Sequence, residues 1–261
     1  MSHQCGGCGG CGSKSQEPRA EPKLPTHPLS QIKTVIGIAG GKGGTGKSLI
    51  TGILAAALAG RGKQVGILDA DILSPAIPQL FELPQGVTRG EAGLYPALSA
   101  QGVKVMSIRL LLDDETESIT WHSATAAGIL QQLWSNVIWD RLDYLFIDLP
   151  PGTGDVSLVT LERLPLSGLL AVSTPQALVN QAVERTVLLA GEKGVPLLGC
   201  IENFSGLFSG DGADALAARH GIPLTDRLAF DPILTDAADE GRVEALGSVY
   251  LPNTIALIKA L

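Results

Sequence analysis

Runs of apolar residues recur along the chain and alternate with longer segments in which apolar residues return every three or four positions. The runs have few polar residues on either alternating face, which is typical of strands that are covered on both sides of a sheet. Strands are therefore predicted at 34–39, 64–71, 103–110, 142–150, 168–175 and 195–203.

The longer segments have the spacing of amphipathic helices. Glycines at 62 and 194 mark the ends of two of them, where helices often stop. Because strands alternate with helices, we predict an α/β fold with a mainly parallel sheet and helices on both faces. The predicted helices are 46–61, 123–139, 177–194, 212–221, 231–242 and 249–261.

Residues 1–30 show neither pattern. They are rich in glycine, proline and serine. A segment of that kind buries too little apolar surface to offset its loss of conformational entropy on ordering. We therefore predict a flexible N-terminal tail at 1–30 and one folded domain at 31–261.

The charge and the apolar content of the chain indicate which kinds of partner and which location to expect. The chain has 261 residues and a formal net charge of −7, which argues against a nucleic-acid partner. No apolar run reaches the ~18 residues of a membrane helix, and the segment 249–261, with one lysine, gives little support to a stable membrane association. The start, MSHQCGGCGG, lacks the features of a signal peptide, so we expect a cytoplasmic location with reduced thiols.

The stretch GKGGTGKS matches the phosphate-binding pattern G-x-x-x-x-G-K-S, after a predicted strand and at the start of a predicted helix. Its glycines let backbone N–H groups converge on phosphate oxygens at the helix N-terminus. Lys47 can reach the β- and γ-phosphates of ATP, and Ser48 can bind Mg²⁺. The nucleotide-binding residues predicted here are Gly41, Lys42, Gly43, Gly44, Thr45, Gly46, Lys47 and Ser48.

Acidic residues end neighbouring predicted strands. Asp148 ends YLFID and is expected to orient the Mg²⁺ shell. Asp69 and Asp71 end another strand, and one of them is expected to orient the attacking water or to hold the metal shell. The loop PPGTGD, 150–155, combines stiff prolines with mobile glycines and can respond to a γ-phosphate. All of these residues are expected at the carboxyl edge of the sheet, where such folds bind ligands.

Lys42 is a second lysine inside the phosphate loop, and KGGTGKS with this lysine is the signature of the deviant Walker A ATPases. That class includes nitrogenase iron protein, the arsenite-pump ATPase and the septum-site and plasmid-partition ATPases. Within it, the blocks ILDADI, PAIPQL, WDRLDYLFIDLPPGTGDVSL, LSGLLAVSTPQ and GCIENFSGLF resemble the Mrp/ApbC group of iron–sulfur cluster carriers. The resemblance covers residues 31–261.

This resemblance implies a homodimeric ATP hydrolase that holds two ATP molecules at its interface and passes a 4Fe–4S cluster to apoproteins. It implies that Lys42 reaches across to the nucleotide of the second subunit. It also implies that Asp71 lies near the hydrolytic water, Asp148 near Mg²⁺, and that Asn203 reads the adenine edge. Lys42, Lys47 and Asp71 are therefore the expected catalytic residues.

Three blocks depart from the family's pattern. DADIYGPSIP is DADILSPAIP here, at 69–78, and Trp-Arg-Gly-Pro is WHSA, at 121–124. The family's ENMS is usually followed by a C-x-x-C pair that holds the cluster, whereas ENFSGLFSGDGADAL contains no cysteine. The usual cluster site is therefore absent, and Cys200, which precedes this block, is expected to be a small buried hydrophobe.

The other cysteines are Cys5, Cys8 and Cys11, in CGGCGGCG. Two overlapping C-x-x-C steps let one short loop direct three thiolates at one metal centre, like the first three ligands of a ferredoxin run. The fourth position is open to His3, to a thiol of the second subunit or to a recipient protein. Zinc is the competing metal, and a tail whose cysteines bind nothing is the third reading.

Three functions fit these features. The first is an ATPase that carries an iron–sulfur cluster to apoproteins. The second is a positioning or regulatory ATPase without a cluster, like the partition and septum-site proteins. The third is a maturation ATPase that inserts nickel or another metal into an enzyme, and metal analysis of the purified protein separates it from the first.

Overall fold

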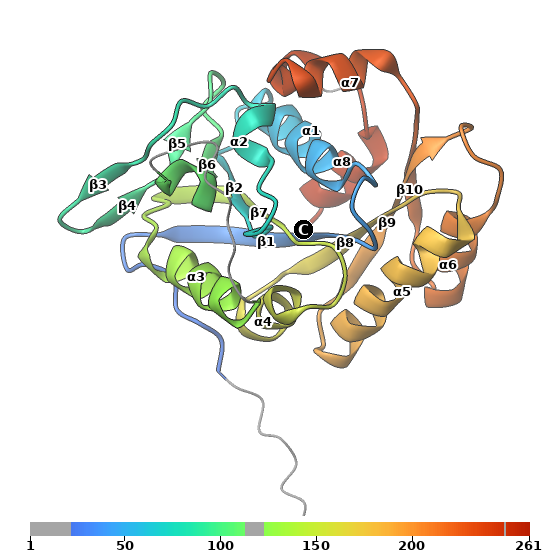
Figure 1. Ribbon diagram of the computed structural model, residues 1–261, viewed down its shortest axis with the longest axis horizontal. Helices are drawn as coiled ribbons and strands as arrows, with labels where there is room; N and C mark the ends of the chain where they lie inside the picture. Colours follow the sequence, from blue (N-terminus) through green and yellow to red (C-terminus); the bar gives the residue numbers. More distant parts are fainter. Residues whose placement is uncertain (1–21, 113–122, 248) are drawn as a thin grey trace, which may run out of the picture.

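The computed structural model describes residues 22–112, 123–247 and 249–261. One eight-stranded sheet lies at its centre (Figure 1). Its strands are β1 (Gln31–Gly40), β2 (Val65–Asp69), β5 (Ala97–Leu98), β6 (Lys104–Met106), β7 (Arg141–Asp148), β8 (Gly168–Ser173), β9 (Leu197–Ser205) and β10 (Leu224–Ala229). Their order is β10-β9-β8-β1-β7-β2-β6-β5, and of these strands only β5 runs antiparallel to its neighbour. The hairpin of β3 (Thr88–Gly90) and β4 (Gly93–Tyr95) stands apart.

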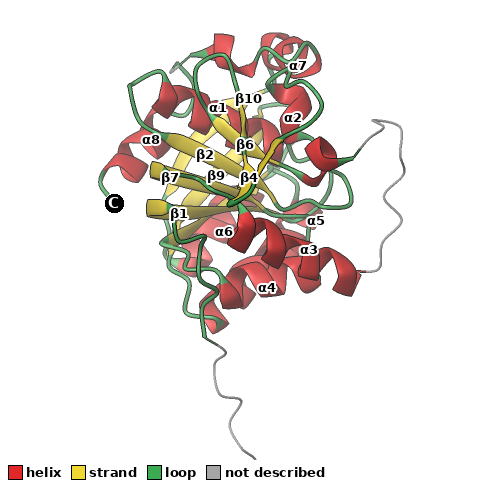
Figure 2. Cartoon of the chain, turned by 90° about the vertical axis from the view of Figure 1, so that its left-hand side faces the viewer, coloured by secondary structure: helices red, strands yellow, loops and turns green. Residues whose placement is uncertain are grey.

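A layer of helices covers each face of the sheet (Figure 2). One layer contains α1 (Lys47–Ala59), α2 (Ile77–Leu80), α7 (Pro232–Asp239) and α8 (Pro252–Lys259). The other contains α3 (Ser123–Asn136), α4 (Asp155–Arg163), α5 (Ala177–Glu192) and α6 (Gly212–His220). The predicted α/β fold, with a mainly parallel sheet between two helical layers, is confirmed.

The alternation of side chains along each strand divides the core between the two faces. In β1, Ile36 and Ile38 belong to the apolar cluster under α1, together with Phe146 of β7. Val35 and Ala39 of the same strand belong to the cluster under α3 and α4. A strand that is buried on both faces reads as a continuous apolar run, and this is why the central strands could be predicted.

The segment 103–110 departs from its prediction as a single strand, because β6 ends at Met106. The hydroxyl of Ser107 accepts a hydrogen bond from the Arg109 amide and starts a short 3-10 helix at Ile108–Leu111.

Besides the short elements α2, β3, β4 and β5, the elements α4 and β10 are absent from the prediction. Helix α4 begins at Asp155, the last residue of the PPGTGD loop, and the prediction assigns no helix after that loop. In β10, which lies at the edge of the sheet, the polar residue Asp226 and the apolar Leu228 are the buried positions. Such a strand lacks the continuous apolar run of the central strands.

The described end of the predicted tail, residues 22–30, contacts the domain. The Leu24 amide donates to the carbonyl oxygen of Arg163, and Trp134 Nε1 donates to the carbonyl oxygen of Leu24 at 3.1 Å. The Leu24 side chain packs against the apolar cluster under α3 and α4.

Within the described residues, no helix is long and apolar enough to cross a membrane.

The two-faced core makes a stability prediction. Phe146→Ala is expected to lower the free energy of unfolding by about 3–5 kcal/mol, because it empties a fully buried position in the central strand β7. Urea denaturation measures the loss. The control Leu98→Ala, at a side chain that is 62% exposed, should change it by no more than about 0.5 kcal/mol. Equal losses in the two variants would contradict this description of the core.

Candidate functional site

A cavity of about 500 Å³ opens at the carboxyl edge of the sheet. The loop between β1 and α1 forms one wall, and residues that follow β2 and β7 form the rest. The position agrees with the rule that open parallel sheets bind ligands beyond the carboxyl ends of their strands. The lining residues are Lys42, Gly43, Gly44, Thr45, Gly46, Lys47, Ser48, Leu49, Asp71, Leu73, Ser74, Pro150 and Pro151.

The backbone of the β1–α1 loop requires glycine at particular positions. Gly44 and Gly46 have φ angles of 81° and 80°, in the left-handed region that side chains disfavour. A Cβ atom at Gly46 would lie 2.1 Å from Asn203 Nδ2, and one at Gly41 would lie 2.4 Å from the Val183 amide nitrogen. Since Gly46 directly precedes α1, the loop delivers the first amides of that helix to the cavity.

Three polar side chains converge on Asp148 at the end of β7. Lys47 Nζ lies 2.7 Å from Asp148 Oδ2, and the Ser48 hydroxyl donates to the same oxygen at 2.7 Å. The Thr51 hydroxyl donates to Asp148 Oδ1 at 2.8 Å. Asp148 is fully buried, so its charge is offset by the Lys47 ammonium rather than by water.

Thr51 was not among the predicted site residues. Its position offered a signal, because it lies four residues after Lys47 and therefore on the same side of α1. Its hydroxyl also donates to the Lys47 carbonyl oxygen at 3.0 Å. Thr51 thus joins the phosphate loop, the first turn of α1 and the acid of β7.

The two aspartates after β2 occupy different environments. Asp71 lines the cavity, and burial raises the pKa of its carboxyl, although the Lys47 ammonium opposes the rise. Asp69 is fully buried and does not line the cavity. Burial, followed by the neighbouring Asp148 carboxylate, raises the pKa of Asp69 to about 8. Asp71 is therefore the aspartate of this pair that can meet a ligand.

Asn203 lies at the end of β9 and contacts the phosphate loop directly. Its Nδ2 donates to the Thr45 carbonyl oxygen at 2.8 Å, which leaves Oδ1 free to accept another hydrogen bond. Lys42, on the opposite part of the loop, is exposed, and its ammonium has no hydrogen-bond or ion-pair partner among the described residues. The sequence prediction assigns Asn203 to the adenine edge and Lys42 to the nucleotide of a second subunit. In the structure, Lys42 lies in the phosphate loop and Asn203 contacts that loop at Thr45.

The PPGTGD loop is fastened to its surroundings at one glycine. The Gly152 amide donates to the Gly40 carbonyl oxygen at the end of β1. The Thr186 hydroxyl of α5 donates to the Gly152 carbonyl oxygen at 3.5 Å. This loop therefore contacts the strand that leads into the phosphate loop.

The predicted metal-binding cysteines Cys5, Cys8 and Cys11 lie outside the described residues. Cys200 lies in β9 and is fully buried, as expected. Burial raises the pKa of its thiol to about 12, so it stays protonated near neutral pH and is unsuited to bind a metal. Within the described residues, no group of three or more His, Cys, Asp or Glu side chains could hold a metal ion.

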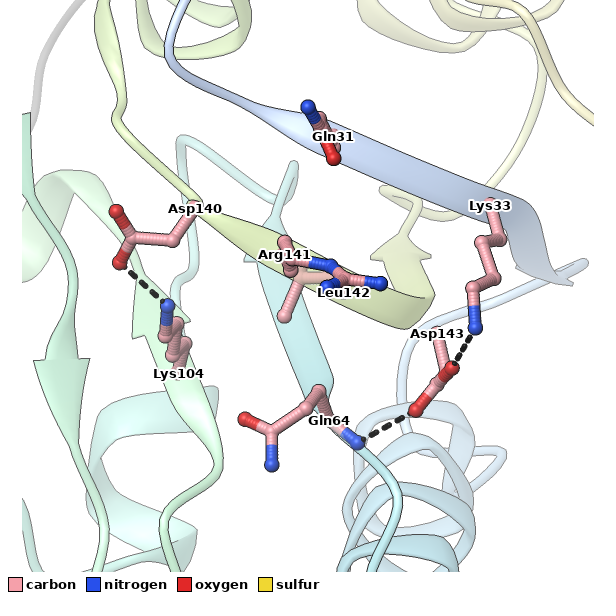
Figure 3. Close-up of a pocket in the computed structure, with 8 residues that line it drawn as sticks. All are labelled: Gln31, Lys33, Gln64, Lys104, Asp140, Arg141, Leu142 and Asp143. Atoms are coloured by element: carbon pink, nitrogen blue, oxygen red, sulfur yellow. Dashed lines mark hydrogen bonds and ion pairs between the residues drawn. The ribbon is translucent and has the colours of Figure 1, made fainter.

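A second hollow, of about 470 Å³, lies at the amino ends of β1, β2, β6 and β7, on the opposite edge of the sheet (Figure 3). Its two lysines are neutralised: Lys33 Nζ lies 2.5 Å from Asp143 Oδ1, and Lys104 Nζ lies 2.7 Å from Asp140 Oδ2. Its lining contains no glycine loop. It therefore lacks the converging amides that bind phosphate.

Comparisons with known proteins agree with this geometry. A family model described as "ParA: NUBPL iron-transfer P-loop NTPase" matches residues 31–255. An iron–sulfur cluster carrier protein of Methanocaldococcus jannaschii is 37% identical over 75% of this chain and 72% of its own. The "Cytosolic Fe-S cluster assembly factor NUBP2" of Rattus norvegicus is 36% identical over 76% of this chain and 79% of its own.

Solved structures give the same picture. The nucleotide-binding protein of Archaeoglobus fulgidus, in complex with ADP, is 39% identical, has a TM-score of 0.72, and is matched over 82% of this chain and 89% of its own. The cell division ATPase MinD of Pyrococcus furiosus is 21% identical, with a TM-score of 0.63 over 87% of this chain and 97% of its own. At that identity the second likeness shows the fold alone.

The glycine geometry makes a prediction about nucleotide binding. Gly46→Ala is expected to weaken Mg-ADP binding about tenfold or more, because the new methyl group meets Asn203 and the left-handed backbone disfavours a side chain. Isothermal titration calorimetry measures the change. Gly128→Ala is the control, since a Cβ atom there has nothing within 4 Å and the residue lies in α3. Wild-type affinity in the Gly46 variant would contradict the described loop.

Proposed function

The chain belongs to the NUBPL iron-transfer P-loop NTPase family, and on that premise we propose that it binds and hydrolyses ATP and carries an iron–sulfur cluster to apoproteins. Lys47 and Ser48, which directly follow the glycine-rich loop, contact Asp148 at the end of β7, and this is the observation that carries the nucleotide part. The relatives named as cluster carriers, which match about three quarters of the chain, support the cargo.

The residues around Asp148 fit a magnesium ion. A hydroxyl oxygen of Ser48 and carboxylate oxygens of Asp148 lie together, and Mg²⁺ prefers oxygen ligands from one or two such groups beside the phosphates. When bound, Mg²⁺ would neutralise charge on the phosphate oxygens. Lys47 would then turn its ammonium toward the β- and γ-phosphates, and Thr51 would keep Asp148 in place through its hydrogen bond.

The same residues suggest how ATP is oriented and cleaved. Asp71 lies at the cavity wall, where its carboxylate can orient a water molecule toward the γ-phosphate. Asn203 offers Oδ1 to the adenine amino group while its Nδ2 stays on Thr45. Lys42 would reach the nucleotide of a second subunit, so the working unit would be a homodimer. This role of Lys42 is supported by its exposure and its lack of a partner among the described residues.

The cluster would be held by Cys5, Cys8 and Cys11. The chain has four cysteines, and the fourth, Cys200, is a buried thiol with a raised pKa. A 4Fe–4S cluster held by three thiolates leaves one coordination position for His3, for a second subunit or for the recipient. We also propose a cytoplasmic location, which agrees with the description of the rat relative as cytosolic.

A positioning or regulatory ATPase is the alternative function. The structures that would support it, such as the cell division ATPase, share the fold at 21% identity. The named carriers share 36–37% identity over most of their own length. The carrier function is therefore better supported.

Lys42→Ala tests the proposed dimer mechanism. The variant is expected to keep Mg-ATP affinity within about threefold of wild type, because Lys47 still meets the phosphates. Its kcat for ATP hydrolysis should fall by about a hundredfold or more, because charge stabilisation from the second subunit is lost. Phosphate release and ATP-dependent dimerisation in solution are measured. Wild-type hydrolysis by the variant would rule out this role.

A triple variant tests the cargo. Wild-type protein reconstituted anaerobically with iron and sulfide should show the visible absorption and Mössbauer signals of a 4Fe–4S cluster. Replacing Cys5, Cys8 and Cys11 by alanine should abolish these signals, whereas Cys200→Ala should preserve them, because that thiol is buried and protonated. Equal iron binding by the triple variant would exclude the cysteine tail, and zinc alone in the native protein would favour a structural metal site.

A further inference from the structure

The fully buried Asp69 stands beside Asp148 in the centre of the sheet. The two residues are directly paired in the register of β2 and β7, so their side chains share one face. Asp148 has the ammonium of Lys47 at 2.7 Å. Asp69 has no ion-pair partner within the described part of the chain and does not line the cavity. Its carboxyl group therefore has no access to the cavity or to solvent.

Three hydrogen-bond donors from three separate places meet the Asp69 carboxyl group. The Asp71 amide donates to Oδ1 at 3.2 Å, and the Ile77 amide donates to Oδ2 at 3.3 Å. The Ser107 hydroxyl, at the end of β6, also donates to Oδ2 at 3.0 Å. Asp71 is the second residue after β2, near the start of the loop, and Ile77 begins α2. One buried side chain thus holds both ends of the loop and ties them to a neighbouring strand.

We propose that Asp69 is a positioning residue for ATP hydrolysis: by clamping residues 70–77, it fixes Asp71 at the wall of the nucleotide cavity. Asp69 acts through Asp71 and does not itself touch the nucleotide. This role rests on the proposed ATPase activity and adds a residue to it. Within the loop, the Ser74 amide donates to the Asp71 carboxylate at 3.2 Å, which orients that carboxylate on the clamped backbone.

Burial of an acidic side chain at position 69 lowers stability, and this cost supports a functional reason for Asp69. Burying a carboxyl group next to the Asp148 carboxylate is unfavourable, and a well-packed apolar residue at such a position is often as stable or more stable. An apolar residue would leave the Asp71 and Ile77 amides without their acceptor. A carboxyl group supplies two oxygens, and here one accepts from the Asp71 amide while the other accepts from the Ile77 amide.

The competing explanation is that Asp69 itself orients the water or the metal shell. Its side chain is fully buried, and the cavity wall after β2 is made by Asp71, Leu73 and Ser74 instead. A change at Asp71 separates the two explanations. If Asp69 acts only through Asp71, the two losses in kcat do not add in the double variant, because the residues act as one unit. If Asp69 acts on its own, the two losses combine.

The experiment is a double-mutant cycle on full-length protein, with steady-state phosphate release as the readout. Asp69→Asn and Asp71→Asn are each expected to lower kcat about tenfold or more with KM within about threefold, since both variants misplace or remove the carboxylate at the water. The double variant should be no slower than the slower single variant. Ser107→Ala removes one donor without changing charge and should lower kcat by about two- to fourfold. Asp143→Asn, on the opposite edge of the sheet, is the control and should leave kcat unchanged.

Hydrogen exchange gives a readout that does not depend on turnover. The amides of residues 71–74, 76 and 77 should exchange at least about tenfold faster in Asp69→Asn than in wild type, while the amides of β7 keep their protection. Losses that multiply in the double variant, unchanged kcat in Asp69→Asn, or wild-type exchange in the loop would each overturn the positioning role. Absence of hydrolysis by the wild-type protein would instead overturn the proposed ATPase function, and the exchange result would still decide whether Asp69 clamps the loop.

Discussion

The buried contact between Lys47 and Asp148 organises the carboxyl edge of this protein. It joins the first residue of α1 to the last residue of β7 with both side chains almost completely removed from water. A buried pair of this kind is costly to break, because either partner alone would be an uncompensated charge. Ser48 and Thr51 add hydroxyl donors to the same carboxylate, so the beginning of α1 is fixed against the centre of the sheet. The phosphate loop takes its shape from these fixed ends.

Much of the fold could be predicted because the central strands are buried on both faces. Runs such as TVIGIA place Ile36 and Ile38 under one helical layer and Val35 under the other, so the apolar signal is unbroken. The edge strand β10 gave no such signal, since polar Asp226 is one of its buried residues. The contacts of Leu24 were also hidden, because an isolated leucine in a proline-rich segment has no periodic partners to reveal what it packs against.

The sequence showed which side chains belong to the site but not how deeply each of them is buried. LDADI contains two aspartates at the end of one strand, and the sequence alone leaves either of them available to a ligand. In the folded protein, Asp71 lines the cavity, whereas Asp69 is fully buried and does not line it. Thr51 escaped notice because a threonine in an apolar helix reads as a packing residue. Such distinctions depend on which way a side chain turns at the strand end, and that is decided by tertiary contacts.

The close approach of Gly46 and Asn203 has a consequence for how this protein can vary. Any side chain at position 46 collides with the amide of residue 203, and loss of that amide leaves the Thr45 carbonyl oxygen without its donor. Each single exchange is therefore harmful on its own, although a compensated pair of exchanges is sterically conceivable. The phosphate loop and the end of β9 are thus physically coupled, because the side chain that fits at position 46 depends on the side chain at position 203.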